Sequence, residues 1–67
     1  MKLYRARLMQ SMDHILKSKI DISKAKISEY SYFDEERDKY TTYTNLDFED
    51  LDLLNSFIKS WDEYVLS

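Results

Sequence analysis

The chain contains neither glycine nor proline among its 67 residues. Glycine supplies left-handed backbone in tight turns and proline supplies rigid breaks, so every turn here has to be made by other residues. Flexible linkers and phosphate-binding glycine loops are excluded for the same reason. We therefore expect one compact domain that covers residues 1–67.

Cysteine is also missing, so no disulfide stabilises the fold, and we expect a reducing, cytoplasmic environment. A domain of this length buries only about 60% of the surface that its unfolded chain exposes. Two sources of extra stability remain. One is close packing of the six tyrosines, three phenylalanines and one tryptophan, and the other is a homodimer with a shared core.

Charge is distributed unevenly along the chain. Residues 1–26 carry seven Lys or Arg against two Asp, a balance of +5, whereas residues 29–52 carry nine Asp or Glu against two basic residues, a balance of -7. The net charge of -3 disfavours direct binding to nucleic acid. The longest apolar run is Tyr64–Leu66, so we expect neither a membrane span nor association with a membrane.

Two segments show the spacing of amphipathic helices. Residues 4–16 place their apolar side chains on one helical arc, which predicts an N-terminal helix. From Phe48 to Val65, apolar residues recur every three or four positions and predict a C-terminal helix. Asp47 is the expected N-cap of that second helix, with Leu46 and Leu51 as its hydrophobic staple.

The middle of the chain fits two structures. The segments 27–33 and 40–44 are rich in aromatic and β-branched residues, which predicts a β-hairpin connected by Asp34 to Asp38. The same residues also fall on one helical arc, but the run of threonines has poor helix propensity and favours strands. Ile20 and Ile22 alternate with polar residues and suggest a short third strand.

The expected fold is therefore α+β, with N-terminal and C-terminal amphipathic helices packed on a small antiparallel β-hairpin. An all-α three-helix bundle is the alternative. In either case the expected core consists of Leu8, Met12, Ile15, Leu16, Ile27, Phe33, Leu51, Leu54, Phe57, Ile58 and Trp61.

No pattern indicates an enzyme, a cofactor site or a metal site. His14 is the only side chain that titrates near neutral pH without a shifted pKa, and no nucleophile is paired with it in the sequence. Residues 47–52 are dense in acids, as in a calcium loop, but they lack the glycine and the distal glutamate of that loop. We name no catalytic, cofactor-binding or metal-binding residues.

The most distinctive segment runs from Tyr30 to Asp52, where tyrosines and acids are interleaved. Tyrosines form binding hot spots, and spaced carboxylates imitate the phosphates of DNA. A simpler interpretation places the rings in the core and leaves the acids as a solvated face. Under the first interpretation the partner-binding residues are Tyr30, Tyr32, Asp34, Glu35, Glu36, Asp38, Tyr40, Tyr43, Asp47, Glu49 and Asp50.

These features predict a small non-enzymatic acidic protein that binds and blocks another protein with a basic surface, at a place where nucleic acid would otherwise bind. In general composition the chain resembles the small inhibitors that phages and mobile elements make against host proteins. The alternative is a self-associating structural or assembly protein that has no foreign partner.

Overall fold

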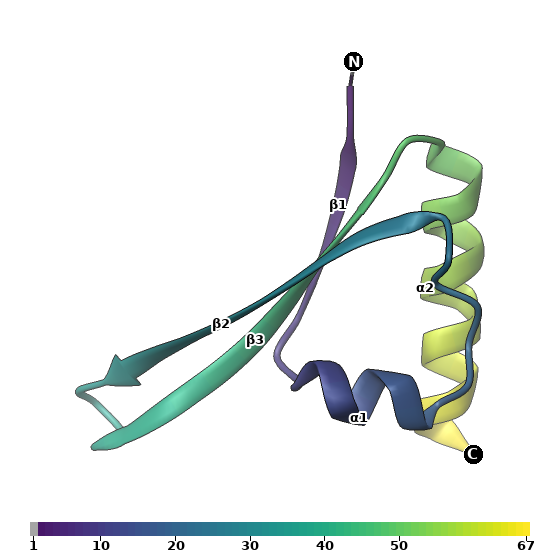
Figure 1. The fold of residues 1–67 in the computed structure, drawn as a ribbon. Coiled ribbons are helices and arrows are strands. Elements are labelled where there is room, and N and C mark those ends of the chain that lie inside the picture. Colours follow the sequence, from purple (N-terminus) through teal and green to yellow (C-terminus); the bar gives the residue numbers. More distant parts are fainter. Residues whose placement is uncertain (1) are drawn as a thin grey trace.

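The computed structural model describes residues 2–67 and contains a three-stranded antiparallel sheet with two helices (Figure 1). In chain order the elements are β1 (Tyr4–Leu8), α1 (Met12–Lys17), β2 (Ala25–Asp34), β3 (Lys39–Phe48) and α2 (Leu51–Leu66). The strand order in the sheet is β1-β3-β2, so β3 is the central strand.

Alternation along the strands gives the sheet two different faces. The helix face carries Ala6, Ile27, Leu46 and Phe48, which pair across the strands in register and pack against the two helices. The other face, which we call the open face, has no helix on it. Its side chains between the body of the protein and the hairpin turn are Arg5, Arg7, Lys26, Ser28, Tyr30, Tyr32, Asp34, Lys39, Thr41, Tyr43, Asn45 and Asp47.

The core lies between the helix face and the two helices. The rings of Phe48 and Phe57 are 5.7 Å apart, and Phe57 stacks on Trp61 at 6.2 Å. Helix α1 contributes Ile15, which is almost completely buried. The whole buried apolar cluster consists of Ala6, Ile15, Leu46, Phe48, Leu54, Phe57 and Trp61.

The expected layout of the fold is wrong at the N-terminus. Residues 4–16 do not form one helix packed on a hairpin, because Tyr4–Leu8 is a strand and only Met12–Lys17 is helical. Ala6 faces the core while Arg5 and Arg7 face outward, and all three pair with β3. Pairing with β3 provides hydrogen-bond partners for the backbone N–H and C=O groups of this strand. The spacing of the apolar side chains alone did not reveal that partner strand. The three-helix alternative is unsupported as well.

Two smaller expectations near the sheet also change. Ile20 and Ile22 lie in the connection from α1 to β2 and form no strand, although both pack against the core. The hairpin of the middle segment is present but longer than expected, because β3 continues through Asp47 to Phe48. Helix α2 consequently begins at Leu51, and its N-cap is Asp50 instead of Asp47.

The expected core is correct in part. Ile15, Leu54, Phe57 and Trp61 are buried. Four other expected core residues, Leu16, Phe33, Leu51 and Ile58, are between 41% and 52% exposed. Phe33 lies where the hairpin extends beyond the helices, and the other three lie on the exposed sides of α1 and α2. Leu8, Met12 and Ile27 are partly buried.

Candidate protein-binding arm

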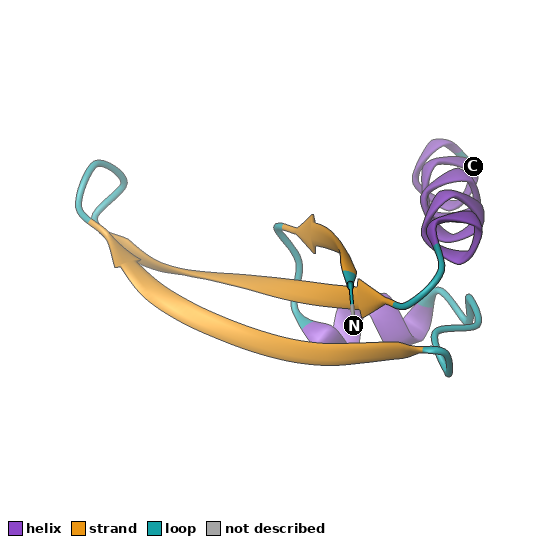
Figure 2. Ribbon diagram, turned by 90° about the horizontal axis from the view of Figure 1, so that it is seen from above, coloured by secondary structure: helices purple, strands orange, loops and turns teal. Residues whose placement is uncertain are grey.

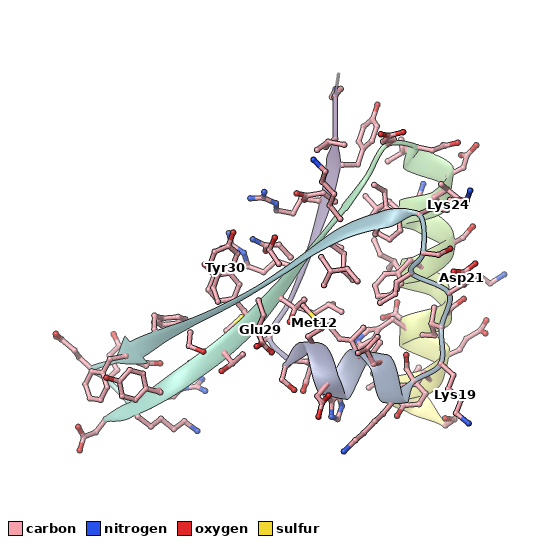
Figure 3. The ribbon with its side chains drawn as sticks, in the orientation of Figure 1. Met12, Lys19, Asp21, Lys24, Glu29 and Tyr30 are labelled. Atoms are coloured by element: carbon pink, nitrogen blue, oxygen red, sulfur yellow. The ribbon has the colours of Figure 1, made fainter. Side chains whose placement is uncertain are left out.

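The hairpin extends well beyond the helices. Residues 30–43, which we call the hairpin arm, project to one side of the body as a twisted two-stranded ribbon (Figures 1 and 2). Glu29 marks its base, because the Glu29 carboxylate accepts a 2.8 Å hydrogen bond from the backbone N–H of Met12 at the start of α1 (Figure 3). Beyond this point, both faces of the ribbon are largely exposed.

Four aromatic rings of the arm are exposed to solvent. Tyr40 is 76% exposed, and Tyr30, Phe33 and Tyr32 are between 44% and 49% exposed. Monomeric domains rarely leave so many large rings uncovered in one place, and such patches mark interaction sites. The rings pair with one another across the two strands, which holds them in fixed positions.

The rings divide between the two faces of the arm. On the open face, Tyr30 stacks on Tyr43 at 5.4 Å, and Tyr32 lies 6.0 Å from Tyr43. On the opposite face, Phe33 meets Tyr40 edge to face at 5.3 Å. A partner that approaches from either side therefore meets aromatic surface.

The turn at the end of the arm is built by an aspartate. The Asp34 carboxylate accepts hydrogen bonds from the backbone N–H groups of Glu36 and Arg37. Asp38 then takes a left-handed conformation, with φ of 53°, that turns the chain into β3. Aspartate tolerates this conformation better than most residues do, and it replaces the glycine that the chain lacks. The result is an ordered acidic tip.

The structure gathers eight of the eleven expected partner-binding residues onto the arm. Tyr30, Tyr32, Tyr40 and Tyr43 lie on its strands, and Asp34, Glu35, Glu36 and Asp38 lie in or beside its turn. The other three, Asp47, Glu49 and Asp50, lie at the far end of β3, so they do not share a surface with the tip. Asp50 accepts a hydrogen bond from the backbone N–H of Asp52 as the helix cap.

Asp47 has a structural partner on β1. The Arg5 guanidinium donates two hydrogen bonds to its carboxylate, at 2.8 and 3.2 Å, and lowers the pKa of Asp47. Lys26 lies opposite Asp47 on β2, the strand on the other side of β3, and also lowers the pKa of Asp47. Asp47 therefore ties β3 to β1 on the open face.

The body end of the open face is basic, in keeping with the excess of Lys and Arg in residues 1–26. Arg5, Arg7 and Lys26 lie there beside the single acid Asp47. The Arg7 guanidinium lies 4.8 Å from the centre of the Tyr43 ring and donates a hydrogen bond to the Asn45 side chain. The alternation of Arg5 and Arg7 with apolar residues was the available signal for a strand with a basic outer face.

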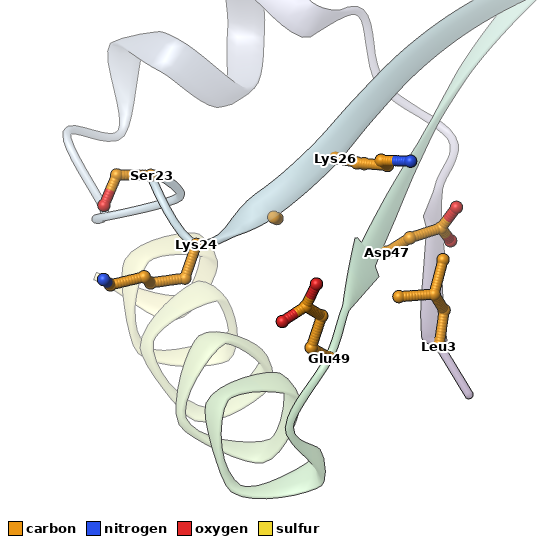
Figure 4. Close-up of a pocket in the computed structure, with 7 residues that line it drawn as sticks. Leu3, Ser23, Lys24, Lys26, Asp47 and Glu49 are labelled. Atoms are coloured by element: carbon orange, nitrogen blue, oxygen red, sulfur yellow. The ribbon is translucent and has the colours of Figure 1, made fainter. Parts of the chain in front are cut away.

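A shallow hollow of about 390 Å³ lies beside this basic end (Figure 4). Lys24 and Lys26 line it together with Asp47 and Glu49. Positive and negative side chains balance, so the hollow shows no preference for a ligand of either charge.

A metal-binding grouping is not seen within residues 2–67. No set of three or more His, Cys, Asp or Glu side chains in that range is arranged as metal ligands. His14 lies on the exposed side of α1, with its ring edge toward Trp61 at 6.2 Å. Across the same residues, neither helix has the length and apolar character needed to cross a membrane.

Comparison with protein-family models, with curated proteins and with solved structures gave no match to this chain.

Proposed function

We propose that this chain is a non-enzymatic binding protein that docks onto another protein through its hairpin arm. The observation that carries the proposal is the cluster of exposed rings on the arm, led by Tyr40 at 76% exposure. Tyrosines contribute large contact area with little loss of side-chain entropy, and they are common among the residues that dominate binding energy.

The charge of the tip supports a basic target. Around the turn, Asp34, Glu35, Glu36 and Asp38 outnumber the two basic residues Arg37 and Lys39. A compact acidic tip accelerates association with a positively charged surface and has less effect on the dissociation rate. The proposed partner is a cytoplasmic protein, and its site is a surface that ordinarily binds nucleic acid.

Under this proposal, the shape of the protein explains how it would block the binding site of its partner. A ribbon with rings on both faces fits into a groove, and the body behind it then obstructs access to that groove. This is steric inhibition of the kind used by small proteins of phages and mobile elements. It requires no chemistry from the chain.

Affinity capture from a cell lysate tests the proposal. The wild-type protein is compared with Tyr32→Ala/Tyr40→Ala on the arm, and with Val65→Ala as a matched control that removes exposed apolar surface from α2. We expect one dominant partner that Val65→Ala retains and the double variant loses. The association rate should fall as salt rises. Retention of the partner by the double variant, or capture of no partner, would contradict the proposal.

The alternative function, a self-associating protein with no foreign partner, is supported by a different observation. Part of the central strand has a free edge, and this edge lies on the arm.

A further inference from the structure

The central strand β3 is paired on both sides over only half of its length. On one side β2 pairs with all ten of its residues, from Lys39 to Phe48. On the other side β1 pairs only from Thr44 to Phe48. The stretch Lys39–Tyr43, which we call the free edge, therefore presents backbone N–H and C=O groups to solvent.

Natural proteins usually protect such an edge with charges, bulges or proline, and this one has little of that protection. The pairing of β2 with β3 is continuous and has no bulge, and the free edge contains no proline. Lys39 is its only charged residue. The outer edge of β2, in contrast, carries Lys26, Glu29 and Asp34, which discourage pairing with another chain. The free edge is thus the better site for strand addition.

A hollow of about 440 Å³ runs beside the free edge. Met9, where the chain leaves β1, lines it together with Arg37 from the turn, Thr41 and Thr42 from β3, and Tyr32 and Asp34 from β2, so the hollow also extends over the open face. The free edge thus lies between the end of β1 and the acidic turn, and the hollow leaves space beside it. A strand added there would pair with the five residues of the free edge.

We propose that a second copy of this chain fills the space, pairing its own Lys39–Tyr43 antiparallel to the first around a two-fold axis at Thr41. The two hairpins then form one four-stranded sheet in the order β2-β3-β3-β2. This interface is isologous, because the same five residues are used on both sides. It does not depend on any foreign partner.

Pairing around Thr41 gives favourable side-chain neighbours. Thr41 faces Thr41 of the second copy, and threonine pairs are favourable across antiparallel strands. The Thr41 hydroxyl is buried and has no hydrogen-bond partner among the described residues, so a rotation toward the axis would provide one. Lys39 faces Tyr43 of the second copy, where a cation lies near an aromatic ring.

Charge also favours this arrangement. In the paired strands, the turn of each copy ends beside the last residues of β1 in the other copy. The turn as a whole, in which the acids outnumber Arg37 and Lys39, thereby approaches Arg7 at the basic end of the open face. One face of the protein is basic at the body and acidic at the tip, and an antiparallel pair places unlike ends together.

A perpendicular two-fold axis keeps both open faces on the same side of the joined sheet. The rings of Tyr30, Tyr32 and Tyr43 from the two copies then form one continuous surface. The proposed dimer would therefore enlarge the aromatic surface instead of hiding it.

Sedimentation equilibrium of the purified protein gives the first test. We expect twice the chain mass of 8.2 kDa. Cysteine cross-linking then locates the axis, because the chain has no cysteine of its own. Residues opposed in an antiparallel pair have Cα atoms about 4.5 to 5.5 Å apart, which a disulfide can span. Thr41→Cys should form a covalent dimer under mild oxidation, and Asp62→Cys on α2 should not.

A charge series provides the second test. Thr41→Lys and Thr41→Glu each place like charges on the axis and should be monomeric, whereas a mixture of the two should form a heterodimer. Val65→Lys, an equal charge change on α2, should remain dimeric. A monomeric wild type, equal cross-linking at both cysteine positions, or a mixture that stays monomeric would overturn the proposal. All these measurements use purified protein, so they are independent of partner capture.

Discussion

At the scale of single residues, the absence of glycine leaves two visible marks on the backbone. Lys19 and Asp38 both have positive φ, at 59° and 53°. Asp38 belongs to a residue type that tolerates this region, but lysine does not. Lys19 follows the last turn of α1, and its N–H donates to the Leu16 carbonyl as a helix-terminating residue does. Here the chain adopts an unfavourable conformation in order to end a helix.

Lys19→Gly should stabilise the protein. A left-handed conformation costs a non-glycine residue roughly 1 to 2 kcal/mol, and glycine removes this cost. Part of that gain is offset, because glycine has greater freedom in the unfolded chain. We expect the free energy of unfolding to rise by about 1 kcal/mol, measured by urea denaturation. Lys17→Gly, at the last residue of α1, is the control and should lower it by up to about 1 kcal/mol. Equal destabilisation by both variants would show that Lys19 is not strained.

The Arg5–Asp47 pair should make stability depend on acid pH. Because the Arg5 hydrogen bond lowers the pKa of Asp47, the ionised carboxylate stabilises the folded state above the pKa it has when unfolded. This contribution is lost as pH falls through the folded-state pKa. Asp47→Asn should therefore show a shallower loss of unfolding free energy between about pH 5 and pH 2. Asp62→Asn on α2 should retain the wild-type slope, and an unchanged slope in Asp47→Asn would contradict the expectation.

At the scale of elements, β3 organises the fold. Five of its residues, Thr44 to Phe48, lie between two strands, and Thr44, Leu46 and Phe48 point into the core. The side chains of the other half are exposed or only partly buried. A residue of the same type should therefore contribute differently to the free energy of unfolding in each half of the hairpin.

Two phenylalanines separate these roles. Phe48 is 2% exposed and touches Phe57, whereas Phe33 is 46% exposed on the arm. Phe48→Ala should cost roughly 3 to 5 kcal/mol, which is most of the stability of a domain this small. Phe33→Ala should cost about 1 kcal/mol or less, because it loses only the ring pair with Tyr40. Thermal unfolding followed by circular dichroism compares the two. Similar costs would mean that Phe33 is packed more tightly than its 46% exposure indicates.

The sequence predicted the elements in the middle and at the C-terminus better than at the N-terminus. Long aromatic and β-branched runs and a sustained helical period are local signals, and both produced the expected element. Residues 4–8 are ambiguous, because Tyr4 and Leu8 fit both a strand and a helix. Only pairing with β3, forty residues later in the chain, decides between them. Helix α2 begins later than expected for a related reason. Asp47, its expected N-cap, is held in the sheet by Arg5.

The candidate site was predictable to a similar degree. The local sequence singled out the tyrosines and the acids of the turn, because they stand next to one another along the chain. The separation of Asp47, Glu49 and Asp50 from that group depends on the length of β3, and the free edge depends on where β1 ends. The length of β3 and the end of β1 are both set by pairing between distant strands. Local sequence patterns do not encode that pairing.

At the scale of the whole molecule, the protein is thin and extended. Its dimensions are 37 × 34 × 17 Å, and its radius of gyration of 12.8 Å exceeds the roughly 11 Å typical of a compact domain of this length. The arm accounts for the difference. It places aromatic surface, an acidic tip and an unpaired strand edge on one projection, so partner binding and dimer formation can be tested on the same fourteen residues, 30–43.

The division of β3 has a consequence for motion. Amide protons between Thr44 and Phe48 are exchanged for solvent deuterium only when the core itself opens, because two strands and a helical layer enclose them. Those of the arm are released by local fraying, since one neighbouring strand is all that holds them. The outer part of the ribbon can therefore fray while Leu46 and Phe48 stay enclosed, so opening at the tip leaves the core of the body intact.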